Sequence, residues 1–225
     1  MKLTIKPEYV KALLLIAAKQ DIRYYLNGIS IDVRQNGDVA DVTLVATDGH
    51  RLLALALDQE DIEAPLVGNW IIDRALLESV KPVKAGKMES PLTLSLTIAA
   101  PSQDSEGRTC LANPVVTLQG ATTATGTVVD GRFPDWRRVV PTTADGLSSQ
   151  YDHEYLYSMG RVGRLLFAGT KQTAAVIHHN GNGAALVTFP GAPYAIGVLM
   201  PMRVGVEAGP APHPGLPSWA QLSPA

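Results

Sequence analysis

The chain has 225 residues, of which 46% are hydrophobic and 18% are charged, a composition that supports a buried core and excludes disorder throughout. No apolar run reaches the roughly 20 residues that a bilayer-spanning helix needs, and the first residues lack the apolar stretch of a secretory signal, so we expect no membrane partner. The single cysteine, Cys110, excludes an intrachain disulfide and favours a cytoplasmic location, whereas the net charge of -2 does not by itself indicate nucleic acid.

The first part of the chain predicts one helix followed by three strands. The helix begins at Pro7, a residue favoured in the first turn, and the apolar residues that follow have helical spacing. Two strands are expected over 29–34 and 39–46, joined through Asn36-Gly37, which is a strong hairpin signal. A third strand is expected over 51–57.

The same order recurs twice. A second helix is predicted to begin near Asp73, a good N-cap residue, and a third covers residues 152–167. Each is followed by three predicted strands, over 92–99, 110–119 and 122–129 in one case and over 174–179, 184–189 and 194–200 in the other. The fold class is therefore α+β, with helices on one face of antiparallel sheets. The first two units form a natural pair, and the third has no obvious mate within the chain.

These units suggest a division of the chain. Residues 1–142 are expected to form a domain of two units, and residues 149–204 half of a second domain. Residues 205–225 are rich in Pro, Gly and Ala without an apolar period, so we expect a disordered tail.

Four short motifs carry the functional interpretation. They are Arg23-Tyr24-Tyr25-Leu26-Asn27-Gly28, Thr47-Asp48-Gly49-His50-Arg51-Leu52, Asp130-Gly131-Arg132-Phe133-Pro134-Asp135-Trp136-Arg137-Arg138 and Met200-Pro201-Met202-Arg203. In this order they resemble the bacterial sliding clamp family, the beta subunit of DNA polymerase III, in a shortened form. The resemblance implies the DNA clamp fold, with residues 1–142 similar to the middle domain and residues 149–204 similar to the second half of the last domain. It also implies a non-catalytic accessory subunit that surrounds duplex DNA and holds partner proteins by a short peptide.

The resemblance implies a peptide-binding site between these two parts. Its positions fall on Leu26, Thr47, Gly49, His50, Arg51, Leu52, Pro134, Arg138, Val139, Tyr155, Val198, Met200, Pro201, Met202 and Arg203. The residue types agree, because aliphatic side chains, Met and Pro form an apolar patch that arginines can rim. The alternative is that the aliphatic residues are plain core and that Asp48-Gly49 is only a turn.

A DNA-facing surface is implied as well. The family's positions fall on Gln20, Arg23, Tyr24 and Tyr25, and helix placement and charge add Lys6, Lys11, Lys81, Lys84, Arg161 and Arg164. The three predicted helices are each net basic while the remainder of the chain is acidic, which suits a protein that meets phosphate on one side. The alternative is that these are ordinary solvated helix faces.

The expected partners are double-stranded DNA, a polymerase, a clamp loader and further copies of the chain. A clamp ring in the family has twelve such units and this chain has three, so we expect a homo-oligomer, with a four-chain ring as one arrangement and neighbours completing the third units. A clamp-like adaptor or decoy that does not encircle DNA is the alternative. No metal-ligand cluster, cofactor loop or catalytic constellation is evident, so we expect neither a cofactor nor an enzyme.

Overall fold

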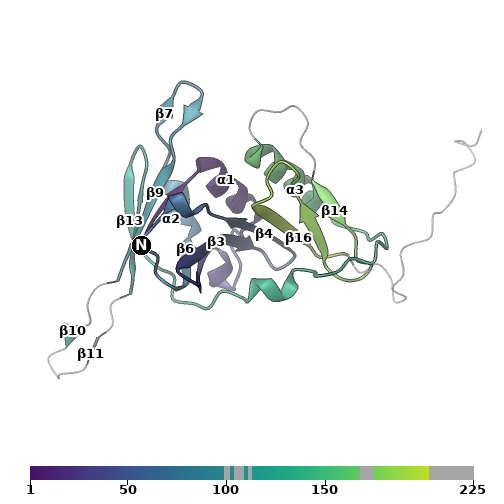
Figure 1. Cartoon of the computed structure of the whole chain (residues 1–225), viewed down its shortest axis with the longest axis horizontal. Helices are drawn as coiled ribbons and strands as arrows, with labels where there is room; N and C mark the ends of the chain where they lie inside the picture. The colour runs from purple at the N-terminus through teal and green to yellow at the C-terminus, as the bar shows by residue number, and fades with distance from the viewer. Residues whose placement is uncertain (99–101, 104–108, 111–112, 168–174, 203–225) are drawn as a thin grey trace, which may run out of the picture.

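A computed structural model describes residues 1–98, 102–103, 109–110, 113–167 and 175–202 of the chain (Figure 1). The predicted tail, residues 205–225, lies outside this part, as does Arg203. In the described residues no helix is both long enough and apolar enough to cross a membrane.

The first unit follows the sequence closely. Its elements are β1 (Lys2–Ile5), α1 (Pro7–Ile16), the short 3-10 helix η1 (Tyr24–Leu26), β2 (Gly28–Asn36), β3 (Val39–Thr47) and β4 (Arg51–Ala56). Pro7 begins α1 as predicted, and Leu13 and Ile16 are fully buried on its apolar face. Gly37 has a φ of 60° in the predicted hairpin, a conformation that favours glycine.

The second unit contains more strands than the sequence predicted. Its elements are η2 (Gln59–Asp61), β5 (Ile62–Glu63), β6 (Gly68–Asp73), α2 (Arg74–Ser79), β7 (Lys84–Ala85), β8 (Met88–Glu89), β9 (Leu92–Thr97), β10 (Ser102–Gln103), β11 (Thr109–Cys110), β12 (Val115–Gln119) and β13 (Thr123–Thr127). Asp73 caps α2 by accepting a hydrogen bond from the backbone nitrogen of Ala75 at 2.7 Å, as expected. The single strand predicted over 110–119 is wrong, because Pro114 has no N–H to donate to a ladder and β12 begins only after it.

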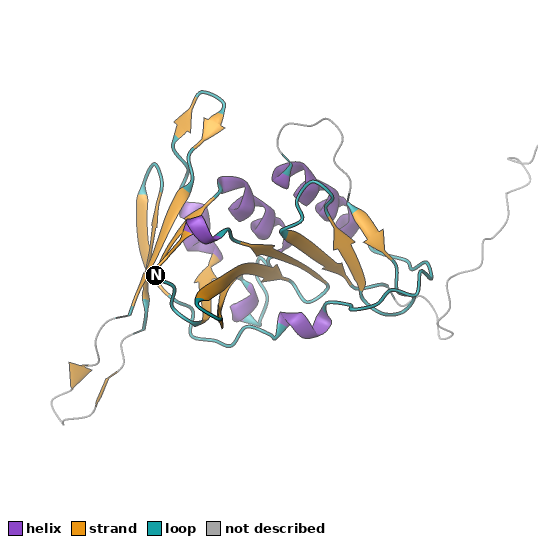
Figure 2. Cartoon of the chain, in the orientation of Figure 1, coloured by secondary structure: helices purple, strands orange, loops and turns teal. Residues whose placement is uncertain are grey.

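The third unit has the predicted order. After η3 (Trp136–Val139) come α3 (His153–Leu166), β14 (Val176–His178), β15 (Ala185–Thr188) and β16 (Ala195–Leu199). Asp152 caps α3 through its side chain, which accepts from the backbone nitrogen of Glu154 at 2.7 Å. The elements are thus helices combined with antiparallel sheets, in agreement with the predicted fold class (Figure 2).

The first two units exchange strands. β1 lies in a five-stranded sheet with order β13-β12-β9-β1-β5, whereas β6 lies in a seven-stranded sheet with order β14-β15-β16-β4-β3-β2-β6. Each strand therefore precedes the helix of one unit and pairs with the sheet of the other. The sequence analysis missed both strands, each of which stands directly before a helix.

The third unit joins the first. β16 pairs antiparallel with β4, with Val198 opposite Leu52, and α1 packs beside α3 (Figure 1). The prediction that the third unit has no mate within the chain is therefore wrong for one of its edges. Hydrophobic periodicity identifies strands but does not identify which edges meet.

The middle strands of the seven-stranded sheet are buried on both faces. Residues such as Leu53 and Leu55 point into the main core beneath α1 and α3. The alternating residues Leu52 and Ala54 point to the opposite face, into a second cluster with Phe133 and Trp136. These two aromatic residues belong to residues 129–140, here called the strap, which runs across that face and includes η3.

Candidate functional site

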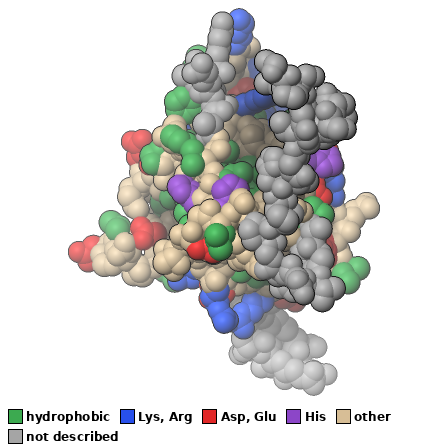
Figure 3. Space-filling view, turned by 90° about the vertical axis from the view of Figure 1, so that its right-hand side faces the viewer, with side chains coloured by type: hydrophobic (Ala, Val, Ile, Leu, Met, Phe, Trp, Pro, Cys, Tyr) green, Lys and Arg blue, Asp and Glu red, His purple; other side chains and the backbone are tan. Residues whose placement is uncertain are grey.

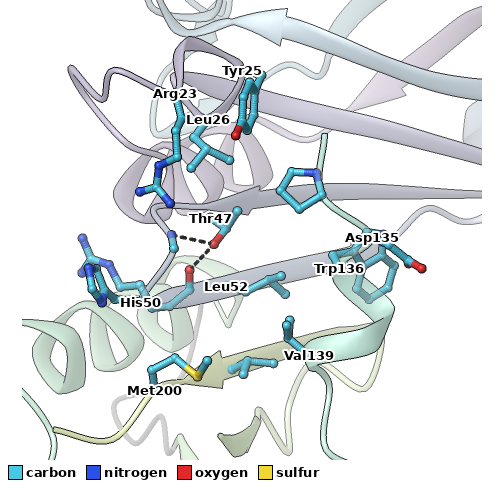
Figure 4. A pocket seen from close by; sticks show the side chains of 14 residues that line it. Arg23, Tyr25, Leu26, Thr47, His50, Leu52, Asp135, Trp136, Val139 and Met200 are labelled. Atoms are coloured by element: carbon cyan, nitrogen blue, oxygen red, sulfur yellow. Dashed lines mark hydrogen bonds between the residues drawn. The ribbon is translucent and has the colours of Figure 1, made fainter. Parts of the chain in front are cut away.

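A pocket opens on the strap side of the sheet, where β4, β16 and the strap meet (Figure 4). Its cavity volume of about 140 Å³ suits one aliphatic or aromatic side chain. It is lined by Arg23, Tyr25, Leu26, Thr47, Gly49, His50, Arg51, Leu52, Pro134, Asp135, Trp136, Val139, Val198 and Met200.

The floor of the pocket is the outer side of the second core cluster. Leu26, Leu52 and Val198 are each at most 3% exposed, so they are core residues as well as pocket residues. Val139 and Met200 at the mouth are 41% and 40% exposed. A hydrophobic side chain that entered between them would lose its water and contact the floor, which stabilises binding by about 1.5–3 kcal/mol.

The turn from β3 to β4 is fixed by its own hydrogen bonds. The Thr47 hydroxyl donates to the Arg51 carbonyl at 2.8 Å and accepts from the Gly49 nitrogen at 3.0 Å (Figure 4). The Asp48 carboxylate accepts from the backbone nitrogens of His50 and Arg51 at 2.9 and 3.0 Å. Gly49 has a φ of 93°, which a side chain rarely allows. The motif is therefore a side-chain-braced turn and also one wall of the pocket.

Charged and aromatic groups hold the rim. The Arg51 guanidinium donates to the Asp48 carboxylate at 2.9 Å and lies 4.9 Å from the centre of the Tyr155 ring, on which His50 stacks at 5.8 Å. Arg23 donates to the Asp48 carbonyl at 3.2 Å, and its hydrogen bonds to Asp21 lower the pKa of that carboxyl to about 2. The two arginines are thus held in place beside an apolar opening.

The opposite wall is anchored through a buried carboxylate. Asp32 of β2 is 6% exposed and accepts hydrogen bonds from the Trp136 indole at 2.9 Å and from Arg137. Burial alone would raise the pKa of Asp32, but the hydrogen bonds from Arg137 and Trp136 outweigh it and hold the pKa below its ordinary value. This contact fixes the Trp136 ring against the pocket floor.

Most of the predicted peptide-binding residues come together here. Those that line the pocket are Leu26, Thr47, Gly49, His50, Arg51, Leu52, Pro134, Val139, Val198 and Met200. Tyr155 contacts the rim through His50 and Arg51 but does not line the cavity, and Arg138, Pro201 and Met202 do not line it either. The sequence analysis missed Asp135 and Trp136 as pocket residues, although both stand inside a motif that it singled out.

The predicted DNA-facing residues are more scattered. Arg23 and Tyr25 line the pocket, Tyr24 donates from its hydroxyl to the Asp130 carbonyl at 2.9 Å, and Gln20 lies in a separate depression beside Asp21.

Several of the basic residues added from charge and helix placement are engaged with neighbours. Lys11 and Lys84 both pair with Glu89, and Lys6 lies 5.4 Å from the Tyr9 ring. Lys81, Arg161 and Arg164 are exposed. In the described residues, no group of three or more His, Cys, Asp or Glu side chains could hold a metal ion.

Comparisons with known proteins agree on one family. A family model described as "DNA polymerase III beta subunit, central domain" matches residues 7–135. The chain is 32% identical over 130 residues to the beta sliding clamp of Salmonella typhimurium, a stretch covering 57% of this chain and 29% of that protein. It is 34% identical over 131 residues to the beta sliding clamp of Pseudomonas aeruginosa, covering 58% and 30%. The chain thus matches less than a third of the length of these relatives.

A solved structure extends the match. The crystal structure of the DNA polymerase III subunit beta from Pseudomonas aeruginosa has a TM-score of 0.58 and 20% sequence identity, and the alignment covers 90% of this chain and 66% of that one. At this identity the likeness shows the shared fold alone.

Proposed function

Because the chain belongs to the family of the DNA polymerase III beta subunit, we propose that it is a non-catalytic, sliding-clamp-type processivity factor. In this proposal it binds clamp-seeking peptides of polymerases and clamp loaders in the pocket between β4, β16 and the strap, and several copies surround duplex DNA. The single observation that supports this best is the pocket, which gathers residues from all four sequence motifs. The last motif contributes Met200 to its lining.

The pocket suits a peptide with an aliphatic or aromatic anchor. An apolar floor accepts the anchor side chain, and Arg23 and Arg51 stand beside the opening, where they are able to bind backbone carbonyls or an acidic residue of the peptide. Met200 at the mouth is unbranched and adapts to anchors of different shape. The floor residues Leu26, Leu52 and Val198 belong to one buried cluster, whose packing holds them in place.

The DNA part of the proposal rests on the family and on exposed cations. Lys81, Arg161 and Arg164 are exposed and available to phosphates, and Tyr24, another residue of the proposed DNA-facing set, is 57% exposed. Contacts of this kind carry no base readout, so binding is expected to be independent of sequence and to weaken steeply with salt.

The experiment for the pocket is a titration of the full chain into a fluorescently labelled peptide that carries a glutamine followed by leucine and phenylalanine. Met200→Glu places a charge at the mouth and is expected to weaken binding by at least about 2 kcal/mol. Met88→Glu is the matched control, because Met88 is 77% exposed on β8 and does not line the pocket. Equal affinity of the two variants would remove the pocket from the proposal.

The experiment for DNA is retention on a nicked circular duplex. A protein that surrounds the duplex stays on the circle in moderate salt and leaves when the circle is cut. The alternative function, a peptide-binding adaptor that does not encircle DNA, predicts peptide binding without such retention. The observation that favours this alternative is that Lys11 and Lys84 of the proposed DNA-facing set are both paired with Glu89.

A further inference from the structure

The junction between the first two units is reciprocal. β1, which leads into α1, pairs with β9 of the second unit, with Leu3 opposite Leu94. β6, which leads into α2, pairs with β2 of the first unit, with Ile72 opposite Ile29. Each unit therefore gives a leading strand to its partner and receives one in return, an arrangement with the symmetry of a two-fold axis.

The third unit contains the two elements that form such a junction, a segment that leads into its helix and a first strand after that helix. Residues 146–151 lead into α3 as β6 leads into α2, and each segment ends at an aspartate that caps the helix. The segment also holds the same position in its unit. The Ile71 carbonyl in β6 accepts from the nitrogen of Val129 at 2.9 Å, just after β13, and the Gln150 carbonyl accepts from the nitrogen of Met202 at 2.8 Å, just after β16.

Both elements are incompletely paired in the part of the chain that the structure describes. β14 pairs with β15 on one side only, whereas its counterpart β2 is covered by β6. Residues 146–151 belong to no sheet among the described residues, although the Leu147 carbonyl accepts from the Gly181 nitrogen at 3.0 Å and the Gly146 nitrogen donates to the His179 carbonyl at 3.1 Å. Large hydrophobic side chains are exposed on the third unit: Leu147 is 53% exposed, Tyr157 59% and Val176 40%. The end view of the molecule shows hydrophobic side chains and histidines on the surface (Figure 3).

The two open edges are chemically compatible. Neither residues 146–151 nor β14 contains Lys, Arg, Asp, Glu or Pro, the residues that usually guard an exposed strand edge against pairing. An uncharged strand edge pairs readily with another extended segment through its remaining backbone groups. A partner that pairs with both edges must offer both a leading segment and an open first strand. The third unit of another copy of this chain offers both.

We infer that two copies of this chain join through their third units around a two-fold axis, with residues 146–151 of each copy hydrogen-bonded to β14 of the other. This inference rests on the proposed function, which includes self-association, and it names the contact through which the copies associate. The segment already lies in the position that the contact needs, so the copies meet without unfolding. Because the contact uses the same surface on both copies, assemblies contain an even number of chains.

The test is the mass of the full chain in solution over a wide range of concentration, by light scattering after gel filtration and by sedimentation equilibrium. The wild-type chain is expected to form dimers or tetramers. Val176→Lys places a charge on the open edge of β14, and Ser149→Pro removes a backbone donor from the side of the leading segment that is opposite to the Gln150 carbonyl. Each change acts twice across the axis, so each is expected to raise the dissociation constant by about tenfold or more.

Matched controls separate this contact from general effects. Val39→Lys changes a valine that is 48% exposed on β3, and Thr143→Pro changes an exposed position in the linker before residues 146–151. Both are expected to leave the mass unchanged. A wild-type monomer at all concentrations, an assembly with an odd number of chains, or equal masses for Val176→Lys and wild type would overturn the inference.

Peptide binding on the same samples keeps the two proposals distinct. Val176 and Ser149 do not line the pocket, so their variants are expected to bind the labelled peptide like the wild type. A chain that dimerises as described but binds no peptide contradicts the proposed function and leaves this inference standing. A chain that binds the peptide but stays a monomer contradicts this inference and leaves the proposed peptide binding standing.

Discussion

The first unit meets its two neighbours in different ways. Toward the second unit it exchanges strands β1 and β6, so that each sheet contains a strand from the other unit. Toward the third unit it shares a sheet edge, β4 with β16, and the packing of α1 against α3. An exchanged strand ties two units into one core. An edge contact leaves a concave region beside the joined strands, and the pocket lies there, between the β3–β4 turn and the strap.

The largest expected effect comes from breaking the exchanged junction. Leu3 of β1 is fully buried and stands opposite Leu94 and Ile62. Leu3→Ala should lower the free energy of unfolding by about 2–5 kcal/mol, because it leaves a cavity where two units share a core. Urea denaturation measures this. Val115→Ala, at a strand position that is 37% exposed, serves as the control and should change stability by less than about 0.5 kcal/mol.

The next effect concerns the strap that crosses both junctions. Trp136→Phe keeps most of the ring but removes the hydrogen bond to the buried Asp32 carboxylate, so it should cost about 1–3 kcal/mol. Trp70→Phe is a matched control, because the indole of Trp70 donates to the neutral Leu66 carbonyl at 3.1 Å and its loss should cost about 1 kcal/mol. Thermal unfolding of both variants checks the difference. Equal losses would mean that Asp32 does not anchor the strap.

The same carboxylate predicts a pH dependence. The pKa of Asp32 is held below its ordinary value in the folded state, so its ionised form contributes stability above the unfolded pKa of about 3.9. That contribution is lost as the pH falls through the folded pKa. Asp32→Asn should therefore show a flatter decline of stability in acid than the wild type, measured by denaturation at a series of pH values. Identical acid slopes would contradict this assignment.

The smallest effect tests the edge junction at the pocket rim. Tyr155 of α3 meets Arg51 and His50 of the first unit. Tyr155→Leu should cost about 0.5–1 kcal/mol of stability, because the contact of the guanidinium with the ring is lost. Tyr155→Phe keeps the ring and should be close to the wild type. Equal stability of Tyr155→Leu and Tyr155→Phe would show that the junction between the two units does not depend on this contact.

The sequence was a good guide to the site where the motif determines its own local geometry. The Thr47–Leu52 motif predicted both a turn and a pocket wall, and both are present because Asp48 and Thr47 bind the backbone of the turn directly. Trp136 was overlooked as a pocket residue, since its partner Asp32 lies far away in the sequence and no local pattern connects the two. Arg23 was assigned to DNA, yet the fold turns it toward the β3–β4 turn and the pocket.

The sequence by itself determined the repeated helix-and-strand units and the N-cap Asp73, because these depend on periodicity and on contacts between near neighbours, and its four motifs indicated the family. Only the tertiary structure decided which edges meet: that β1 and β6 change sheets, that β16 continues the sheet of the first unit, and that β14 is left at its end. Strand edges are made of backbone groups that every residue carries. Their pairing is therefore selected by the whole fold and leaves little trace in any short stretch of sequence.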